Sequence, residues 1–520
     1  MGAPVIGIDL GTTSTRVAVV EDGIPRVLQD EAGRSAMPAM LAVTAEGALQ
    51  LGYDAAAQAV SNVEGVVYAA KRLIGRHWAS PPVADALGTK PYRVVEGPHH
   101  DVRVDLRGSV LAHPEVSAHL IRAMKALAEG HLGQGVERCV LSVPAHFDPD
   151  QRQATRDAAR IAGLEVARLI SEPTAAALTY GLGVQAERTV AVLDLGGGTF
   201  DASVVRVGPA GAEVIATAGD TYLGGEDLTD RVVQWLGSAF KSEHDIDVRR
   251  RRVALARLRE AAEAAKVTLS HADQCEIDLP AVVAGPQGSL DLQVTLTRAE
   301  LEALSSDIVE RCVALSSKAL KAAGLVAEGL DDVVLLGAAT RMPMVQRAVR
   351  AFFGRAPVAS VHRDDSVALG AALLGASLAA GGVTRVVDIT PRHLGLVDAW
   401  SVVEHDVEAY QTVITANSPL PTVATQVFPT TRDDQSTIII MVYQGSSRRW
   451  DQSDLLGELL ITDLPPAPVG QVEVQVTVEL TEDGLVGYSV RDAKRGTDLP
   501  FAVTATPQLS DDELLAMTMK

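Results

Sequence analysis

Cysteine and aromatic residues are scarce in this chain. Its 520 residues include three cysteines and only 4% aromatic side chains. Cys139, Cys275 and Cys312 lie far apart, so they provide neither a disulfide framework nor the paired spacing of a zinc site. A reducing compartment suits such a sequence, and its core is expected to be aliphatic.

An excess of basic charge is also missing. The chain has 46 Lys and Arg against 66 Asp and Glu, a net charge of -20. Nucleic acids and anionic membranes bind basic surfaces, so neither is an expected partner. No run of about 18 apolar residues could cross a membrane, and MGAPVIGIDLGTT does not resemble a secretory signal. A cytoplasmic location is expected.

Helix and strand patterns alternate up to about Gly382. This alternation predicts an α/β unit with helices packed on sheets. Asp148 is expected to cap a helix that Gly163 ends, and Thr297 to cap a long helix that ends near Gly324.

The pattern changes after Asp388. Short segments rich in β-branched residues, such as 435–444 and 471–480, are separated by turn residues. They predict an antiparallel β-domain. The last stretch, 509–520, predicts one short helix capped by Ser510.

Two similar segments lie 185 residues apart: IGIDLGTT at 6–13 and AVLDLGGGT at 191–199. Each is an apolar strand that ends in an aspartate, Asp9 or Asp194, and continues into a Gly/Thr turn. Facing each other, two such turns would clamp phosphate, because glycine lets backbone N–H groups approach an anion closely. The two aspartates would hold Mg²⁺ through water, because Mg²⁺ dehydrates reluctantly.

One such segment alone could equally be an ordinary hairpin, but the pair favours a nucleotide site. No Walker loop is present, and a strand rather than a helix follows each turn, unlike a dinucleotide fingerprint. Residues 335–341 predict a strand that enters a small-residue turn, where a base or ribose could approach. Glu263, Lys266 and Ser270 share one helix face, although the first two alone would be an ordinary surface pair.

Several long strings resemble the heat-shock protein 70 (DnaK-type) chaperones over about residues 4–515. Among them are IGIDLGTTSTRVAV, AAKRLIGRHW, SEPTAAALTYGL, VLDLGGGTFDASVV, GDTYLGGEDL, DITPRHLGL and QVFPTTRDDQSTIIIMVYQG. The resemblance implies a two-lobed, actin-like α/β ATPase domain at 1–382, a linker at 383–388, and an all-β sandwich that binds peptide at 389–507. Residues 508–520 would be a short helix left from the family's lid.

The resemblance also implies ligands and partners. The ligands would be ATP or ADP with Mg²⁺. The partners would be unfolded or extended apolar peptides, a J-domain co-chaperone and a nucleotide exchange factor. Sugar kinases and actin-like filament proteins share the two hairpins but not the other strings. A nucleotide-dependent scaffold with little hydrolysis stays open as an alternative, and a small-molecule kinase is less favoured.

Residues of the ATPase domain take roles from the positions they match. The catalytic positions are Lys71, Glu172, Thr199 and Asp201, and Asp9 and Asp194 match the carboxylates around the magnesium waters. The phosphate turns match at Gly11, Thr12, Thr13, Gly196, Gly197 and Gly198. The adenosine side matches at Gly224, Gly225, Glu226, Glu263, Lys266, Ser270, Gly337, Ala338, Arg341 and Asp364.

Two further groups of residues connect the domains or face the peptide. Pro144 and Arg152 match the relay between nucleotide and peptide, and Arg168 and Asp388 match positions that meet when the domains dock. The peptide positions are Leu396, Ala399, Thr431 and Ile438, where Leu396 and Ile438 are expected to keep an apolar pocket.

Three departures from the family pattern affect these assignments. Ala338 replaces a glycine of the adenosine loop, so its methyl group is expected to crowd the ribose or to disfavour the backbone angle needed there. Tyr222 replaces a histidine. Arg385 stands where the linker usually has leucine, so weaker docking of the linker is expected.

Overall fold

The computed structural model describes residues 4–285, 288–359, 361–382 and 384–519. Two central sheets share one plan, in which an antiparallel hairpin lies beside a parallel strand. The first sheet has the order β12-β11-β1-β2-β3, with β4 beside β2. Its strands are β1 (Val5–Leu10), β2 (Ser14–Glu21), β3 (Ile24–Val27), β4 (Met37–Pro38), β11 (Arg138–Val143) and β12 (Glu165–Ser171).

The second sheet repeats this plan in the order β18-β13-β14-β15-β19. Its strands are β13 (Arg188–Leu195), β14 (Phe200–Gly208), β15 (Gly211–Asp220), β18 (Asp332–Leu336) and β19 (Arg385–Val387). β1 and β13 therefore occupy corresponding positions, and each ends at one of the two Gly/Thr turns that the sequence singled out.

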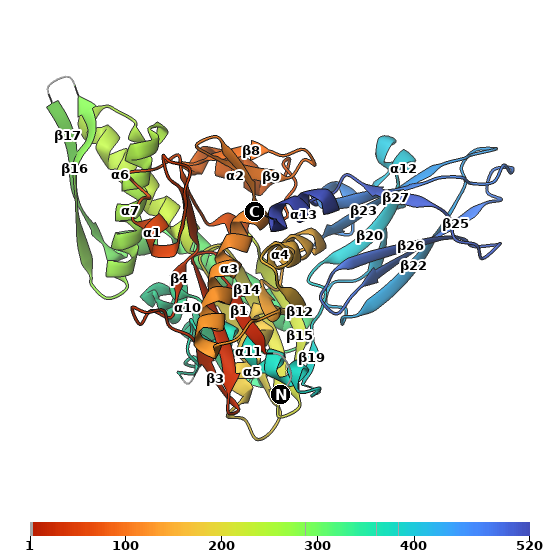
Figure 1. The fold of residues 1–520 in the computed structure, drawn as a ribbon, viewed down its shortest axis with the longest axis horizontal. Coiled ribbons are helices and arrows are strands. Elements are labelled where there is room, and N and C mark those ends of the chain that lie inside the picture. The colour runs from red at the N-terminus through yellow and green to blue at the C-terminus, as the bar shows by residue number, and fades with distance from the viewer. Residues whose placement is uncertain (1–3, 286–287, 360, 383, 520) are drawn as a thin grey trace.

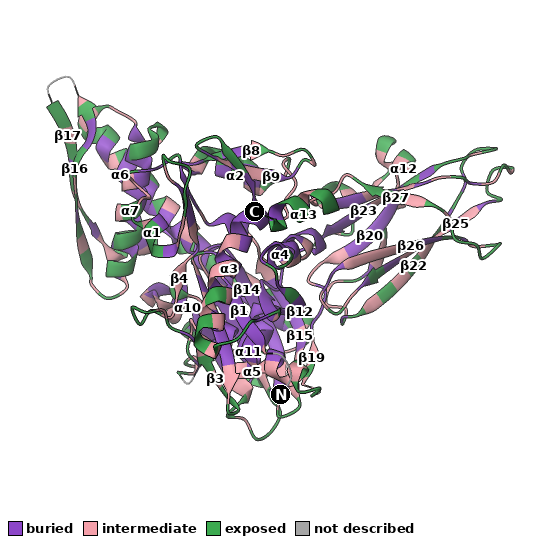
Figure 2. Ribbon diagram, in the orientation of Figure 1, coloured by how far each residue is buried: buried purple, intermediate pink, exposed green. Residues whose placement is uncertain are grey.

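Close helix packing holds the two sheets together. α5 (Glu172–Gly181) contacts both sheets, and it packs on α11 (Ser366–Ala379), which covers the first sheet. A Cβ on Gly7 of β1 would lie 2.1 Å from the backbone N of Ala372, and one on Gly370 would lie 1.8 Å from the carbonyl of Ala175. Only glycine permits these approaches. Figure 2 shows the buried residues concentrated in this central region.

Further helices and strands surround the two sheets (Figure 1). The first lobe adds β5 (Met40–Val43), β6 (Leu49–Leu51), β7 (Val66–Tyr68), β8 (Arg93–Glu96), β9 (Val102–Leu106), β10 (Ser109–Ala112), α1 (Gly52–Ala56), α2 (Pro81–Thr89), α3 (His113–Leu132) and α4 (Pro149–Ile161). The second adds α6 (Gly225–His244), α7 (Arg252–Leu269), β16 (Gln274–Gly285), β17 (Gly288–Thr297), α8 (Arg298–Leu304), α9 (Ser306–Ala322) and α10 (Pro343–Phe353).

The helix expected from Thr297 to Gly324 is in fact two helices. Thr297 caps α8 with a capping box as predicted, but α8 ends at Leu304 and α9 begins at Ser306. Ser305 between them has φ -122° and ψ 5°. Its backbone leaves the helical region there, and its side chain makes no capping hydrogen bond. The helix capped by Asp148 is confirmed as α4, with Gly163 in the left-handed conformation after it.

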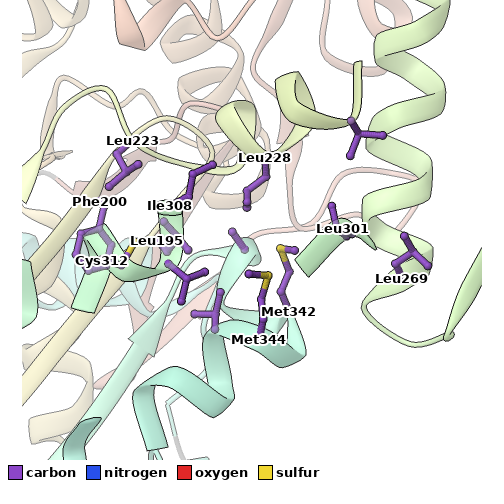
Figure 3. Close-up of a cluster of buried hydrophobic side chains, with 14 of the residues drawn as sticks. Leu195, Phe200, Leu223, Leu228, Leu269, Leu301, Ile308, Cys312, Met342 and Met344 are labelled. Carbon is purple, nitrogen blue, oxygen red and sulfur yellow. The ribbon is translucent and has the colours of Figure 1, made fainter. Parts of the chain in front are cut away.

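An apolar cluster beneath the second turn anchors it. Leu195 of β13 and Phe200 of β14 flank the turn and pack with Ile308 and Cys312 of α9 (Figure 3). All four side chains are buried. This packing holds the ends of β13 and β14, and therefore the turn between them, against α9.

The remaining strands form an antiparallel domain that projects to one side (Figure 1). One sheet has the order β21-β20-β23-β24-β27 and the other β22-β25-β26. Their members are β20 (His393–Asp398), β21 (Gln411–Ile414), β22 (Thr422–Pro429), β23 (Ile438–Gly445), β24 (Asp454–Ile461), β25 (Glu473–Leu480), β26 (Val486–Asp492) and β27 (Phe501–Thr504). A short helix, α12 (Ala399–Val403), follows β20. One apolar core contains side chains of both sheets.

Two segments outside the β-domain lie on the two-lobed body. β19 falls within the expected linker and pairs in parallel with β15 as an added edge strand. α13 (Asp511–Thr518), capped by Ser510 as predicted, packs on α4. Its Leu514 and Met517 are buried in the core of the first lobe. Among the described residues, no helix is long and apolar enough to span a membrane.

Candidate active site

The two Gly/Thr turns face each other across a cleft between the lobes. A Cβ on Gly197 would lie 2.0 Å from Thr13 Oγ1, and one on Gly198 would lie 2.9 Å from Thr12 Oγ1. The cleft has a volume of about 890 Å³, enough for a nucleotide-sized ligand. Of the predicted phosphate residues, it is lined by Gly11, Thr12, Thr13, Gly196, Gly197 and Thr199, whereas Gly198 is packed behind.

A lysine and four carboxylates meet at the base of the cleft. Lys71 Nζ lies 2.5 Å from Glu172 Oε1, and both side chains are buried. Lys71 sits in a 3-10 turn at 70–72, and Glu172 is the first residue of α5. Asp9 and Asp194 reach the cleft from the ends of β1 and β13. Asp201, in β14, lies behind them.

The buried carboxylates lack enough positive charge. Burial raises the pKa of Asp194 well above its usual value, and the neighbouring Glu172, Asp201 and Asp9 carboxylates raise it further. Burial also raises the pKa values of Asp9 and Glu172, although the Lys71 ammonium opposes both shifts. One ammonium therefore faces several carboxylates, and an added cation would hold them ionised.

This set of oxygen donors fits a hard cation such as Mg²⁺. Asp9 and Asp194 stand on opposite sides of the cleft base, at the ends of the two matching strands. Within the described part of the chain, no three His, Cys, Asp or Glu side chains are close enough to hold a metal ion directly.

Asp201 is held from one loop. Its Oδ2 accepts a hydrogen bond from the backbone N–H of Ala145 at 2.9 Å, and its Oδ1 lies 2.7 Å from His146 Nδ1. Asp201 is 1% exposed, so it contacts solvent hardly at all. The loop at 144–148 joins β11 to α4 and contains Pro144.

Polar side chains extend along the other end of the cleft. Lys266 pairs with Glu263 at 2.5 Å and donates to the carbonyl of Gly225 at 3.0 Å. Ser270 ends α7 beside them. Of the ten predicted adenosine positions, the cleft is lined by Gly225, Glu226, Glu263, Lys266, Ser270, Gly337, Ala338 and Asp364.

Gly224 and Arg341 do not line the cleft itself. A Cβ on Gly224 would lie 2.7 Å from the backbone of Gly197, so this glycine supports the second turn from behind. Arg341 donates to both Asp364 oxygens, at 2.9 and 2.6 Å, and faces an adjoining groove.

The loop after β18 requires glycine at position 337 but not at position 338. Gly337 has φ +80°, and a Cβ there would lie 2.2 Å from the carbonyl of Leu195. Ala338 begins a 3-10 turn and is not among the residues with positive φ. The concern that alanine would disfavour the backbone at 338 is therefore wrong, although its methyl group does line the cleft.

Glu226 forms salt bridges with two basic side chains. Its Oε2 lies 2.7 Å from Lys90 Nζ and 2.5 Å from Arg259. These neighbours outweigh the effect of burial and lower the pKa of Glu226 to about 2. Lys90 follows α2 in the first lobe and Glu226 lies in α6 of the second, so this carboxylate joins the two lobes.

Sequence reasoning missed further contacts between the lobes. Arg72 pairs with Asp227, and its guanidinium stacks on the Tyr222 ring at 3.6 Å. The Tyr222 hydroxyl donates to Asp85 of α2 at 2.8 Å. The tyrosine that replaces the family's histidine thus binds the opposite lobe. No local pattern reveals these partners, because they lie more than 130 residues apart.

Of the four predicted relay residues, Arg152 and Arg168 contact the β-domain directly. Arg152 donates to the carbonyls of Ala145 and Phe147, in the loop that begins at Pro144, and to that of Asp483 in the turn between β25 and β26. Arg168 pairs with Glu482 and Asp483.

Asp388, at the end of the linker, accepts from the hydroxyls of Ser171 and Thr174 at 2.9 and 2.7 Å. Among the described residues, Arg168 and Asp388 thus have different partners and do not pair with each other.

The predicted peptide positions do not form one open pocket here. Leu396 and Ile438 are buried in the core between the two sheets of the β-domain. Ala399 begins α12, and Thr431 is exposed in the loop after β22. In this arrangement, peptide would reach Leu396 and Ile438 only if the strands moved apart.

A comparison with protein families gives a match over nearly the whole chain. The family described as Hsp70 protein matches residues 5–520. The matched range runs from β1 through α13.

Proposed function

This chain belongs to the Hsp70 family of ATP-dependent chaperones, and from this premise we propose that it hydrolyses ATP in the cleft between its lobes. We further propose that hydrolysis controls the binding of extended apolar peptides by the β-domain. A J-domain co-chaperone and a nucleotide exchange factor would act on this cycle.

The buried Lys71–Glu172 pair at 2.5 Å, behind the two facing turns, is the observation that carries the proposal. Phosphoryl transfer depends mainly on positioning and on charge stabilisation. The turns, with Thr12, Thr13 and Thr199, would bind the phosphates through N–H and hydroxyl groups. The Lys71 ammonium would offset charge on the terminal phosphate.

The carboxylates would take complementary roles. Glu172, which lines the cleft, would orient the attacking water and accept its proton. The charge of Asp201, buried behind the cleft, would make Glu172 a stronger base for that proton. Asp9 and Asp194 would hold Mg²⁺ through water, and the bound ion would neutralise phosphate charge. Ser142 donates to Asp9 at 3.1 Å and fixes its direction.

The adenosine would lie between α7 and the loop after β18. Glu263, Lys266 and Ser270 provide polar groups on one side, and the backbone at Gly337 and Ala338 lies opposite. Arg341, held by Asp364 at the rim, is placed to cover the base with its flat guanidinium.

Lys71→Ala tests the hydrolytic role. Removing the ammonium leaves Glu172 buried without its partner and the terminal phosphate without its cation. We expect single-turnover hydrolysis to fall by about 100-fold or more, with ATP affinity within a few-fold of the parent. Lys241→Ala, at an exposed position of α6, is the matched control.

The possible outcomes separate the alternatives. A Lys71→Ala chain that hydrolyses ATP like the parent would refute the role of Lys71. A parent chain that binds Mg-ATP without turning it over would be a nucleotide-dependent scaffold. Transfer of phosphate to a sugar or alcohol instead of water would indicate a kinase.

A further inference from the structure

His146 forms a buried pair with one of the carboxylates at the base of the cleft. Its Nδ1 lies 2.7 Å from Asp201 Oδ1, and the two side chains are 8% and 1% exposed. The backbone of β15 encloses the pair, because a Cβ on Gly219 would lie 2.5 Å from Asp201 Oδ1 and 2.6 Å from His146 Nδ1.

The two contacts to Asp201 come from consecutive residues. Ala145 donates its backbone N–H to Oδ2 and His146 contacts Oδ1. Because an ionised carboxylate only accepts hydrogen bonds, His146 Nδ1 carries the hydrogen in this contact. With one donor the carboxylate could still rotate about its Cβ–Cγ bond, whereas a donor on each oxygen fixes its plane.

The loop that carries both donors is fixed in turn by Arg152. The guanidinium donates to the carbonyls of Ala145 and Phe147, the residues on either side of His146, at 3.2 and 3.1 Å. It also donates to the carbonyl of Asp483 in the β-domain at 3.1 Å. A continuous set of contacts therefore runs from the β-domain turn through Arg152 and the loop to Asp201.

We propose that His146 is a positioning residue for ATP hydrolysis. Its Nδ1–H fixes the plane and position of the buried Asp201 carboxylate, whose charge acts on Glu172 as that group takes the proton of the attacking water. This inference rests on the proposed function, since it assigns His146 a part in the same reaction. A histidine that merely stabilised the loop would affect folding, whereas a positioning residue affects the chemical step more than nucleotide binding.

Two substitutions separate these roles. His146→Phe keeps a planar ring but removes the donor. His146→Asn places an amide N–H close to the position of Nδ1 and keeps the donor. The matched control is His113→Phe in α3, because His113 is also buried and its ring nitrogens have no hydrogen-bond partner within the described structure.

Single-turnover hydrolysis of bound ATP, ATP affinity and thermal stability are measured for the parent and the variants. We expect His146→Phe to slow hydrolysis by about tenfold or more while ATP affinity stays within about twofold. His146→Asn should recover most of the rate, and His113→Phe should hydrolyse ATP at the parent rate.

Equal single-turnover rates for the parent and His146→Phe would overturn the inference alone. A parent that binds ATP without hydrolysing it would overturn the proposed function and the inference together. If His146→Phe does not fold, His146→Gln takes its place. The glutamine amide lies one methylene further from the backbone than the asparagine amide, so it does not occupy the position of Nδ1. The single-turnover rate should then fall in His146→Gln and stay near the parent rate in His146→Asn, and equal rates for these two variants would overturn the inference.

Discussion

At the scale of single residues, charge balance dominates the nucleotide cleft. Lys71 is the ammonium that contacts Glu172 directly, and burial raises the pKa values of Glu172, Asp9 and Asp194 together. Their folded environment thus shifts each pKa upward, and an added cation would oppose that shift. This balance explains why a nucleotide with Mg²⁺, rather than a free anion, suits the site.

A second buried carboxyl lies where the C-terminal segment meets α4. Asp150 accepts from Gln508 Nε2 at 2.8 Å. Burial, and then the neighbouring Asp148 carboxylate, raise the pKa of Asp150 from 3.8 to about 8. The unfolded carboxyl loses its proton near pH 4, so between about pH 4 and 8 the folded state holds more protons. Stability contributed by this group is therefore lost as pH rises through that window.

Asp150→Asn removes this titration and keeps an oxygen that can accept from Gln508. We expect the melting temperature of the parent to fall between pH 5 and pH 8 by a few degrees more than that of the variant. Thermal melts across this range test the expectation, with Asp245→Asn at an exposed position as the control. Parallel pH profiles for the parent and Asp150→Asn would contradict it.

At the scale of elements, β19 shows how the linker docks. Val386 is partly buried against the second sheet, whereas the Arg385 side chain is 68% exposed and lies 3.9 Å from Glu213. The linker is therefore anchored by valine, and position 385 faces outward. The expectation that Arg385 weakens docking is not supported, because a leucine at this exposed position would bury little additional surface.

Gly211 is the residue of β15 that makes room for the linker. It has φ +137°, and a Cβ there would lie 1.9 Å from the carbonyl of Arg385. We expect Gly211→Ala to prevent β19 from pairing and to expose the linker to protease in the presence of ATP. Nucleotide affinity should change little, because Gly211 lies at the end of β14 and β15 that is opposite to the cleft.

Limited proteolysis of ATP-bound protein measures this effect, and Arg385→Leu in the same linker is the control that should remain protected. Equal protection of the linker in the parent and Gly211→Ala would show that β19 pairing does not shield it.

Local sequence signals predicted some elements better than others. The two hairpins, α4 and α13 follow from short patterns of strand-end aspartate, turn glycine and capping boxes. The break at Ser305 was missed because a helical pattern continues across it. β19 and its pairing with β15 could not be predicted either, because an edge strand is defined by a partner more than 170 residues away.

The residues of the candidate site were also only partly predictable from local sequence patterns. Asp9 and Asp194 followed from the repeat itself, whereas Lys71, Glu172 and Asp201 required the family resemblance because their segments carry no local chemical pattern. The pairing of Glu226 with Lys90 and Arg259 was out of reach, since it depends on how the lobes meet.

At the scale of the whole molecule, Asp388 of the linker and Asp483 of the β-domain both bind the ATPase domain. Asp388 accepts three hydrogen bonds from Ser171 and Thr174. Asp483 accepts from the backbone N–H of Leu169 and from Arg152. Because Arg152 also holds the loop behind Asp201, peptide-dependent movement of the β-domain would change the geometry around that carboxylate.

Asp388→Ala removes all three acceptor contacts of this buried carboxylate, while the Ser171 and Thr174 hydroxyls still contact each other. Each lost hydrogen bond contributes about 0.5–1.5 kcal/mol, so the docked arrangement should become a minor species. ATP binding should persist, because Asp388 lies outside the cleft.

The measurement that tests the account most directly is steady-state ATP turnover of the parent and Asp388→Ala, each with and without an unfolded apolar peptide. We predict that peptide stimulates the parent several-fold and leaves Asp388→Ala nearly unchanged, because stimulation passes through the docked interface. A parent whose ATP turnover does not respond to peptide, or a variant stimulated as strongly as the parent, would contradict the proposed coupling of hydrolysis to peptide binding.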